Sequence, residues 1–141
     1  MSDLDDAIVV AVLAHHEQCD KAGEPYIFHL INVAQQLHPL DTNGRIVAIL
    51  HDILEDTATT VDDLRFTCTE TQIEAIIAIT RKEGEDYDDY IERVKLNPIA
   101  ARVKICDLRH NLGRLWRLNE STRNRLRPRY ERAMAALGER L

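Results

Sequence analysis

Apolar residues recur at helical spacing along nearly the whole chain, and no stretch alternates in the way that a half-buried strand would. This pattern predicts helices over residues 4–16, 26–37, 45–54, 61–67, 70–80, 87–96 and 98–118, with a last one from about 128 to 137. The segment 20–25 contains Gly23 and Pro25 and is expected to be a loop. We therefore expect an all-α fold, a compact helical bundle in one domain over residues 1–141.

Several ends of these helices carry capping signals. Thr69 begins a capping-box pattern, Asp86 can cap the helix that follows it, and Asn97 stands directly before a proline, which suits a first turn. Pro128 lacks a backbone N–H, so we expect it to break or kink the last element.

Composition places the chain among ordinary globular proteins, with 45% hydrophobic and 30% charged residues in 141. The longest apolar run is eight residues, whereas a membrane-spanning helix needs roughly 20. The acidic N-terminus is no secretory signal, and the three cysteines form no CxxC pair. We therefore expect a cytoplasmic protein with no membrane contact, no disulfide framework and no thiolate zinc site.

The net charge of −6 hides an asymmetry along the chain. Residues 1–97 carry a net charge of −13, whereas residues 98–141 carry +7, and ten of their eleven basic residues are Arg. Such segregation is common on solvated surfaces, but it also suits a basic wall that faces phosphates, for which the forked donors of Arg are well shaped. Nucleic acid is not expected as a partner, because the chain as a whole is acidic.

The stretch AILHDILEDT sets four polar side chains among apolar ones: His51, Asp52, Glu55 and Asp56. On a regular helix they fall within one arc of about 140°. Crowded carboxylates raise one another's pKa unless a cation lies among them, so this pattern favours a divalent metal. A histidine with aspartates suits Mn, Fe, Zn or Co better than Ca. From these residues alone, a solvated helix end with a capping Asp remains the alternative.

Two further polar residues interrupt apolar helices. His29 lies in PYIFHLINVA and is either a metal ligand or a core histidine with a hydrogen-bond partner. Asp107 lies in RVKICDLRHNL and is either a ligand or part of a buried ion pair. Polar residues of that helix share one arc of about 80°, namely Lys104, Asp107, Asn111 and Arg114. His110 lies off this arc and is not expected to take part.

Together, His29, His51-Asp52 and Asp107 resemble the H…HD…D signature of the HD-domain metal-dependent phosphohydrolases. GEPYIFH, LHDILEDT, ITRKEGEDYDDYI and VKICDLRHNL are similar to the hydrolase domain of RelA/SpoT proteins, above all to the small alarmone hydrolases and the metazoan SpoT homologue. The resemblance covers about residues 10–118. It implies a helical bundle of the HD-domain type.

The resemblance also implies an activity, a cofactor and a site. The activity is Mn²⁺-dependent removal of the 3′-pyrophosphate from ppGpp or pppGpp, with other divalent transition metals as options. The matching metal ligands are His29, His51, Asp52 and Asp107. The matching catalytic pair is Glu55 and Asp56, and residues expected near the substrate are Lys21, Arg81, Lys82, Lys104 and Asn111. The chain departs from the family where Leu30 replaces the proline that usually follows the first ligand, and where Lys21 is the only basic residue before GEPY.

Glu55 and Asp56 are expected to orient and deprotonate the attacking water, with Glu55 the nearer of the two. Two rival functions stay open. One is an HD-domain phosphatase that acts on another nucleotide, such as a nucleoside monophosphate or NADPH. The other is a non-catalytic HD module that binds a nucleotide and signals. The partner expected in each case is a small nucleotide, and the sequence leaves the oligomeric state open, a homo-oligomer included.

Overall fold

The computed structural model describes residues 3–138, and within them it contains helices and no strand. The predicted all-α fold is therefore confirmed. In chain order the elements are α1 (Asp3–Ala14), α2 (Ile27–Gln35), α3 (Thr42–Leu50), α4 (Ile53–Asp56), α5 (Val61–Leu64), α6 (Glu70–Ile79), α7 (Tyr87–Lys95), α8 (Pro98–Gly113), the 3₁₀ turn η1 (Leu115–Arg117) and α9 (Glu120–Ala136).

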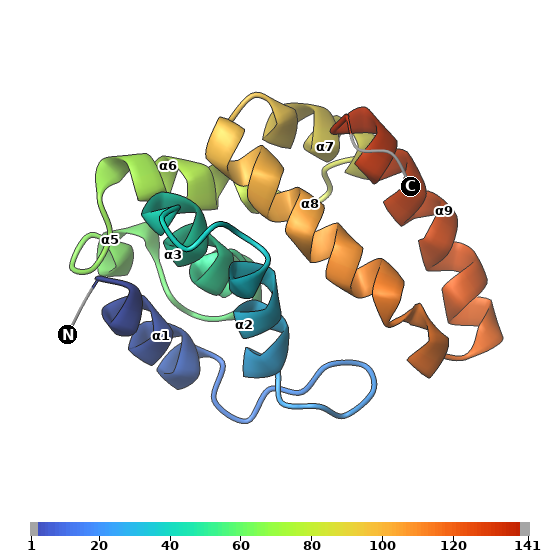
Figure 1. The fold of residues 1–141 in the computed structure, drawn as a ribbon, viewed down its shortest axis with the longest axis horizontal. Coiled ribbons are helices and arrows are strands. Elements are labelled where there is room, and N and C mark those ends of the chain that lie inside the picture. The colour runs from blue at the N-terminus through green and yellow to red at the C-terminus, as the bar shows by residue number, and fades with distance from the viewer. Residues whose placement is uncertain (1–2, 139–141) are drawn as a thin grey trace.

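Helix α8 is the centre of the bundle. It packs against α2, α3 and α6 on one side and against α7 and α9 on the other (Figure 1). Leu108 of α8, Leu30 of α2 and Ile49 of α3 are all fully buried in this core. Burial of one such side chain stabilises the fold by roughly 1.5–3 kcal/mol. Side chains of α2, α3 and α8 that point into the same core therefore have fixed mutual positions.

The capping signals in the sequence mark real helix ends. Thr69 and Gln72 form a reciprocal capping box at the start of α6. The side chain of Asp86 accepts a hydrogen bond from the N–H of Asp89 at the start of α7. Asn97 caps α8 in the same way. Each cap satisfies backbone donors that have no partner within the helix.

The predicted helix 45–54 is wrong in one respect, because it is interrupted at His51 and Asp52. α3 ends at Leu50, α4 begins at Ile53, and Asp52 between them has φ −101° and ψ 1°. His51 Nδ1 lies 2.6 Å from the carbonyl oxygen of Ala48, so this side chain bonds back to its own helix. The 100° per residue spacing therefore does not carry across Asp52. The long helix predicted over 98–118 likewise ends at Gly113, before η1.

Of the break or kink predicted at Pro128, the break is wrong, because α9 begins at Glu120 and runs through this proline without interruption. The carbonyl of Asn124 loses its helical donor there, but both residues are exposed, so water can take the place of the missing N–H. Even α9, at 17 residues, is short. Among residues 3–138, none of the helices combines the length and the apolar character that a bilayer crossing requires.

Candidate metal centre and adjoining cavity

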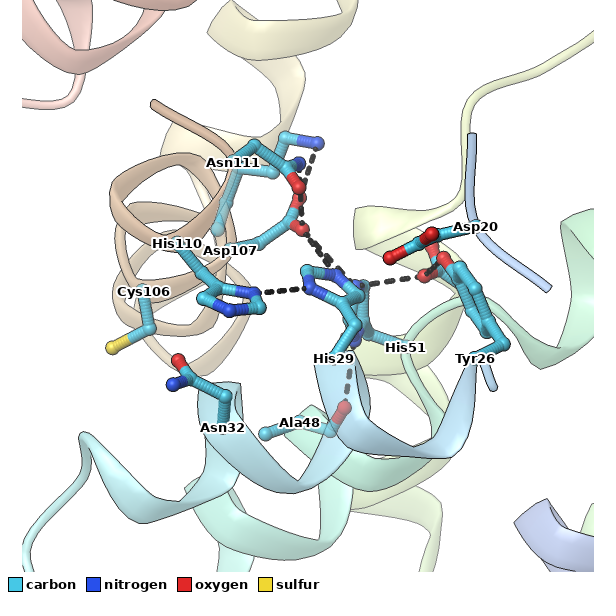
Figure 2. A network of polar contacts seen from close by, with 12 residues as sticks. Asp20, Tyr26, His29, Asn32, Ala48, His51, Cys106, Asp107, His110 and Asn111 are labelled. Carbon is cyan, nitrogen blue, oxygen red and sulfur yellow. Dashed lines mark hydrogen bonds and ion pairs between the residues drawn. The ribbon is translucent and has the colours of Figure 1, made fainter. Parts of the chain in front are cut away.

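Three buried side chains from three helices meet at the centre of the molecule: His29 of α2, His51 at the end of α3, and Asp107 of α8. One ligand atom from each lies within 4.8 Å of the others. The Oδ1 atom of Asp107 is 2.8 Å from Nε2 of His29 and 3.5 Å from Nε2 of His51 (Figure 2). The structure thus brings together three of the four predicted ligands in a group that could hold a metal ion.

The fourth predicted ligand, Asp52, lies at the edge of this group. Its Oδ2 atom is 3.1 Å from Nε2 of His51, and it accepts a hydrogen bond from the hydroxyl of Tyr26. Burial alone would raise the pKa of Asp52, but the neighbouring His51 lowers it to about 2. Asp52 is therefore ionised, and one of its oxygens lies beside the Nε2 atom of His51.

The donor set fits a divalent transition metal. The buried Nε2 atom of His51 faces the carboxylates of Asp52 and Asp107, whereas Nδ1 can donate its proton to the carbonyl of Ala48. That tautomer leaves the Nε2 lone pair directed at the site. Although burial would lower the pKa of His51, Asp52 and Asp107 raise it well above its usual value. The site therefore favours a positive charge, and two imidazoles with two carboxylates suit Mn, Fe, Zn or Co.

His110 takes part in the site, contrary to the expectation from the sequence. Its Nδ1 atom is 2.8 Å from Nδ1 of His29, and the two rings stack with centroids 5.0 Å apart (Figure 2). Burial, with the nearby Arg114, lowers the pKa of His110 to about 4. A neutral His110 can accept the Nδ1 proton of His29, which leaves the Nε2 atom of His29 for a metal. The sequence held one signal for His110: a buried His29 needs a hydrogen-bond partner for each of its two ring nitrogens.

Two residues predicted to contact substrate also hold Asp107. The Lys104 ammonium is 2.9 Å from Oδ2 of Asp107, and the Asn111 amide donates to Oδ1 at 3.2 Å. Burial alone would raise the pKa of Asp107, but Lys104 and the two histidines lower it well below its usual value. Asp107 is therefore ionised, and both of its oxygens are held in place.

The predicted catalytic pair lies on α4, one short turn beyond Asp52. Glu55 Oε1 accepts a hydrogen bond from the backbone N–H of Arg81 at 3.0 Å, which fixes its direction. Partial burial, with the charges of Asp52 and Glu55, raises the pKa of Asp56 to about 6. A carboxylate with such a pKa is suited to proton transfer near neutral pH.

Arg81 and Lys82 lie in the loop between α6 and α7, on the Glu55 side of the site. The Arg81 guanidinium donates to the carbonyl of Glu85 and lies over the ring of Tyr87. Lys82 is exposed. Both residues are thus near α4, although the part of Arg81 that contacts Glu55 is its backbone.

A cavity of about 260 Å³ adjoins the metal-centre residues. Tyr26 and Asn111 line it, and these same two side chains contact Asp52 and Asp107 respectively. Lys21 also lines this cavity, whereas Arg81 and Lys82 do not. The structure therefore brings two of the predicted substrate residues, Lys21 and Asn111, to one hollow beside the cluster.

Comparison with known proteins gives relatives along almost the whole chain, although no family model matches it. A guanosine-3′,5′-bis(diphosphate) 3′-pyrophosphohydrolase of Aquifex aeolicus is 32% identical over 137 residues, which cover 90% of this chain and 20% of the relative. The bifunctional (p)ppGpp synthase/hydrolase SpoT of Escherichia coli is 28% identical, with 87% of this chain and 19% of that protein covered. The chain is a RelA/SpoT homologue. It spans about a fifth of the length of these relatives.

The fold of this RelA/SpoT homologue agrees with that of a solved structure. A metazoan orthologue of SpoT that hydrolyses ppGpp superposes with a TM-score of 0.85, at 19% sequence identity, over 98% of this chain and 86% of that one. The predicted helical bundle of the HD-domain type is therefore confirmed.

Proposed function

We propose that this RelA/SpoT homologue is a metal-dependent phosphohydrolase that removes the 3′-pyrophosphate from ppGpp or pppGpp. The observation that carries the proposal is the buried group of His29, His51 and Asp107, whose ligand atoms lie within 4.8 Å of one another. Support for the substrate comes from relatives that bear this activity in their names and match most of the chain.

His29, His51, Asp52 and Asp107 would hold the metal, which we propose to be Mn²⁺ or another divalent transition metal. When bound, such an ion supplies Lewis-acid polarisation of a phosphoryl group and lowers the pKa of water. His110 and Ala48 would keep the two imidazoles in the tautomer that ligation needs. Lys104 would keep Asp107 ionised and in place.

Glu55 and Asp56 would handle the proton of the attacking water. The water oxygen bonds to the phosphorus attached to the 3′ oxygen, and its proton passes to one of these carboxylates. The bond between that phosphorus and the 3′ oxygen breaks, and the 3′ oxygen leaves with the electron pair and takes up a proton. The products are pyrophosphate and the nucleoside 5′-diphosphate or 5′-triphosphate.

The basic residues predicted near the substrate would offset the charge of the phosphates. Lys21 would do so from the cavity, and Arg81 and Lys82 from the loop beside α4, whereas the neutral amide of Asn111 would contact the nucleoside. Lys104 would act through its ion pair with Asp107.

The test is product analysis with purified protein, Mn²⁺ and ppGpp. We expect equimolar pyrophosphate and GDP, and loss of both products in the double variant Glu55→Gln/Asp56→Asn. The exposed Glu83→Gln serves as the charge-matched control and should be as active as the wild type. No turnover by the wild type, or full turnover by the double variant, would refute the proposal. Release of orthophosphate instead of pyrophosphate would assign a different phosphatase.

A further inference from the structure

Asp20 joins the loop before α2 to the chain that follows α8. One carboxylate oxygen, Oδ2, accepts hydrogen bonds from Arg114 and Arg117, both at 3.0 Å. The other, Oδ1, accepts from the backbone N–H groups of Ala22 and Glu24 at 2.9 and 3.0 Å. Burial would raise the pKa of Asp20, but the hydrogen bond from Arg117 and the two N–H groups lower it. Asp20 is therefore an ionised and fully engaged acceptor.

The positive charge around Asp20 exceeds what one carboxylate can balance. Arg114 and Arg117 both point at it, and Lys21 lines the same cavity. A guanidinium has five N–H donors, and among the described residues these two groups donate three hydrogen bonds through their side chains. Within residues 3–138, the buried Nε atom of Arg117 has no hydrogen-bond partner. Donors of this kind are suited to the oxygens of an anion.

The position of the two arginines relates them to the metal centre. They line the cavity of about 260 Å³ together with apolar side chains such as Leu118 and Leu126 and the ring of Tyr130. Arg114 donates to Oδ1 of Asn111 at 2.9 Å, and Asn111 in turn donates to Asp107. A ligand with an anionic group and an apolar ring could thus extend from Arg114 and Arg117 toward the metal-centre residues.

We propose that Arg114 and Arg117 bind the 5′ phosphate group of the nucleotide, which the reaction does not cleave. Asp20 is the positioning residue that holds both guanidinium groups in place for this phosphate. The inference rests on the proposed function, since it takes the cavity to be the part of the substrate site remote from the reacting bond. Arginine forks match pairs of phosphate oxygens. Because Asp20 orders both side chains beforehand, less conformational entropy is lost when the ligand binds.

The first test measures binding without catalysis, by calorimetry of guanosine 5′-diphosphate with chelator-treated protein. The wild type should bind, and Arg114→Gln and Arg117→Gln should each weaken binding by about tenfold or more. Each variant leaves Asp20 paired with the other arginine, so the fold should persist, as circular dichroism can verify. Arg117→Lys should recover part of the affinity. The matched control is Arg125→Gln, an exposed arginine of α9 that does not line the cavity. No binding by the wild type, or equal weakening in Arg125→Gln, would overturn the inference.

Asp20→Asn separates positioning from simple charge. Removal of a negative charge should by itself strengthen the binding of an anion, whereas loss of positioning should weaken it. We expect weaker binding in Asp20→Asn, and no further weakening when the change is added to Arg114→Gln/Arg117→Gln. If Asp20 were merely structural, Asp20→Asn would weaken binding equally in the wild type and in Arg114→Gln/Arg117→Gln. Stronger binding in Asp20→Asn would contradict the positioning role.

Turnover of ppGpp distinguishes this inference from the proposed function. In an active wild type, the two arginine variants should raise KM and leave kcat nearly unchanged. Unchanged KM and unchanged binding of guanosine 5′-diphosphate in both variants would overturn the inference and leave the proposed function standing. If the wild type binds guanosine 5′-diphosphate through these arginines but releases no pyrophosphate, the proposed function would be refuted and the binding role of the arginines would stand.

Discussion

Two regions, one on α8 and one on the turn that follows it, are built in opposite ways. Around Asp107, one carboxylate and two imidazoles from three helices are buried together and favour a cation. About two turns later, Arg114 and the following Arg117 gather on Asp20, leave donors unmatched and favour an anion. Asn111 hydrogen-bonds to both regions. Helix α8 and the turn that follows it could therefore present the proposed metal site and the proposed phosphate site side by side.

The two regions also differ in how firmly they are held. The side chains of His29 and His51 are each only 2% exposed and come from packed helices. The side chains of Arg114 and Arg117 are about a fifth exposed, at 19% and 21%, and meet a loop. We therefore expect substitutions of His29 or His51 to abolish activity, and substitutions of Arg114 or Arg117 to alter the affinity for the nucleotide.

The largest effect is expected from His51→Asn. Loss of this ligand should remove the bound metal and lower kcat/KM by about 10³-fold or more, because several kcal/mol of transition-state stabilisation come from the metal. The measurement is steady-state release of pyrophosphate from ppGpp at saturating Mn²⁺. The exposed His38→Asn should behave as the wild type. Equal activity of the two variants would show that His51 is no ligand.

The next effect is expected from Asp56→Asn, which changes the proton acceptor and spares the metal ligands. We expect kcat to fall by about 10²-fold, within the usual range for general-base catalysis. Manganese affinity, measured on the same sample, should stay within about threefold of the wild-type value, since Asp56 is not a ligand in this scheme. A parallel loss of manganese would instead place Asp56 among the ligands.

A smaller effect is expected from His110→Ala. Loss of the partner of His29 Nδ1 should weaken metal affinity by about 10–100-fold, as is typical for residues that orient a ligand. His110→Asn keeps an acceptor and should be affected less. Competition with a calibrated chelator gives the affinities. Identical affinities in both variants and the wild type would mean that the stacked ring has no influence on the metal.

The smallest effect concerns the loop that holds Glu55, outside both regions. A hydrogen bond from Arg93 lowers the pKa of Glu85 to about 2, from a usual value of 4.5. A carboxylate whose pKa is lower in the folded than in the unfolded state stabilises the fold at pH values above its unfolded-state pKa. This contribution is lost as the pH falls from about 4.5 toward 2. Urea unfolding should therefore find Glu85→Gln less stable than the wild type at pH 7, with a difference that vanishes near pH 2. A constant difference at all pH values would contradict this ion pair.

The sequence predicted the helices and the candidate metal ligands better than it predicted the contacts of Arg114 and Arg117 with Asp20, for physical reasons. His29 and Asp107 stand out because a polar side chain inside an apolar helix must find a partner. His110 was missed because an arc drawn on one helix ignores the neighbouring helix that supplies His29. Spacing along the chain could not pair Asp20 with Arg114, since only the packed loop brings them together. In the uninterrupted α9, Pro128 stands at an exposed position, where water can hydrogen-bond to the carbonyl of Asn124 that lacks a helical donor.

The most direct test of the central claim is Mn²⁺ binding followed by electron paramagnetic resonance, with wild type and His51→Asn compared at equal concentration. The claim is that the buried cluster is the metal centre of this RelA/SpoT homologue. It predicts one tightly bound Mn²⁺ per chain in the wild type and none in the variant at the same free metal concentration. Equal binding by both proteins, or no binding by the wild type, would contradict it.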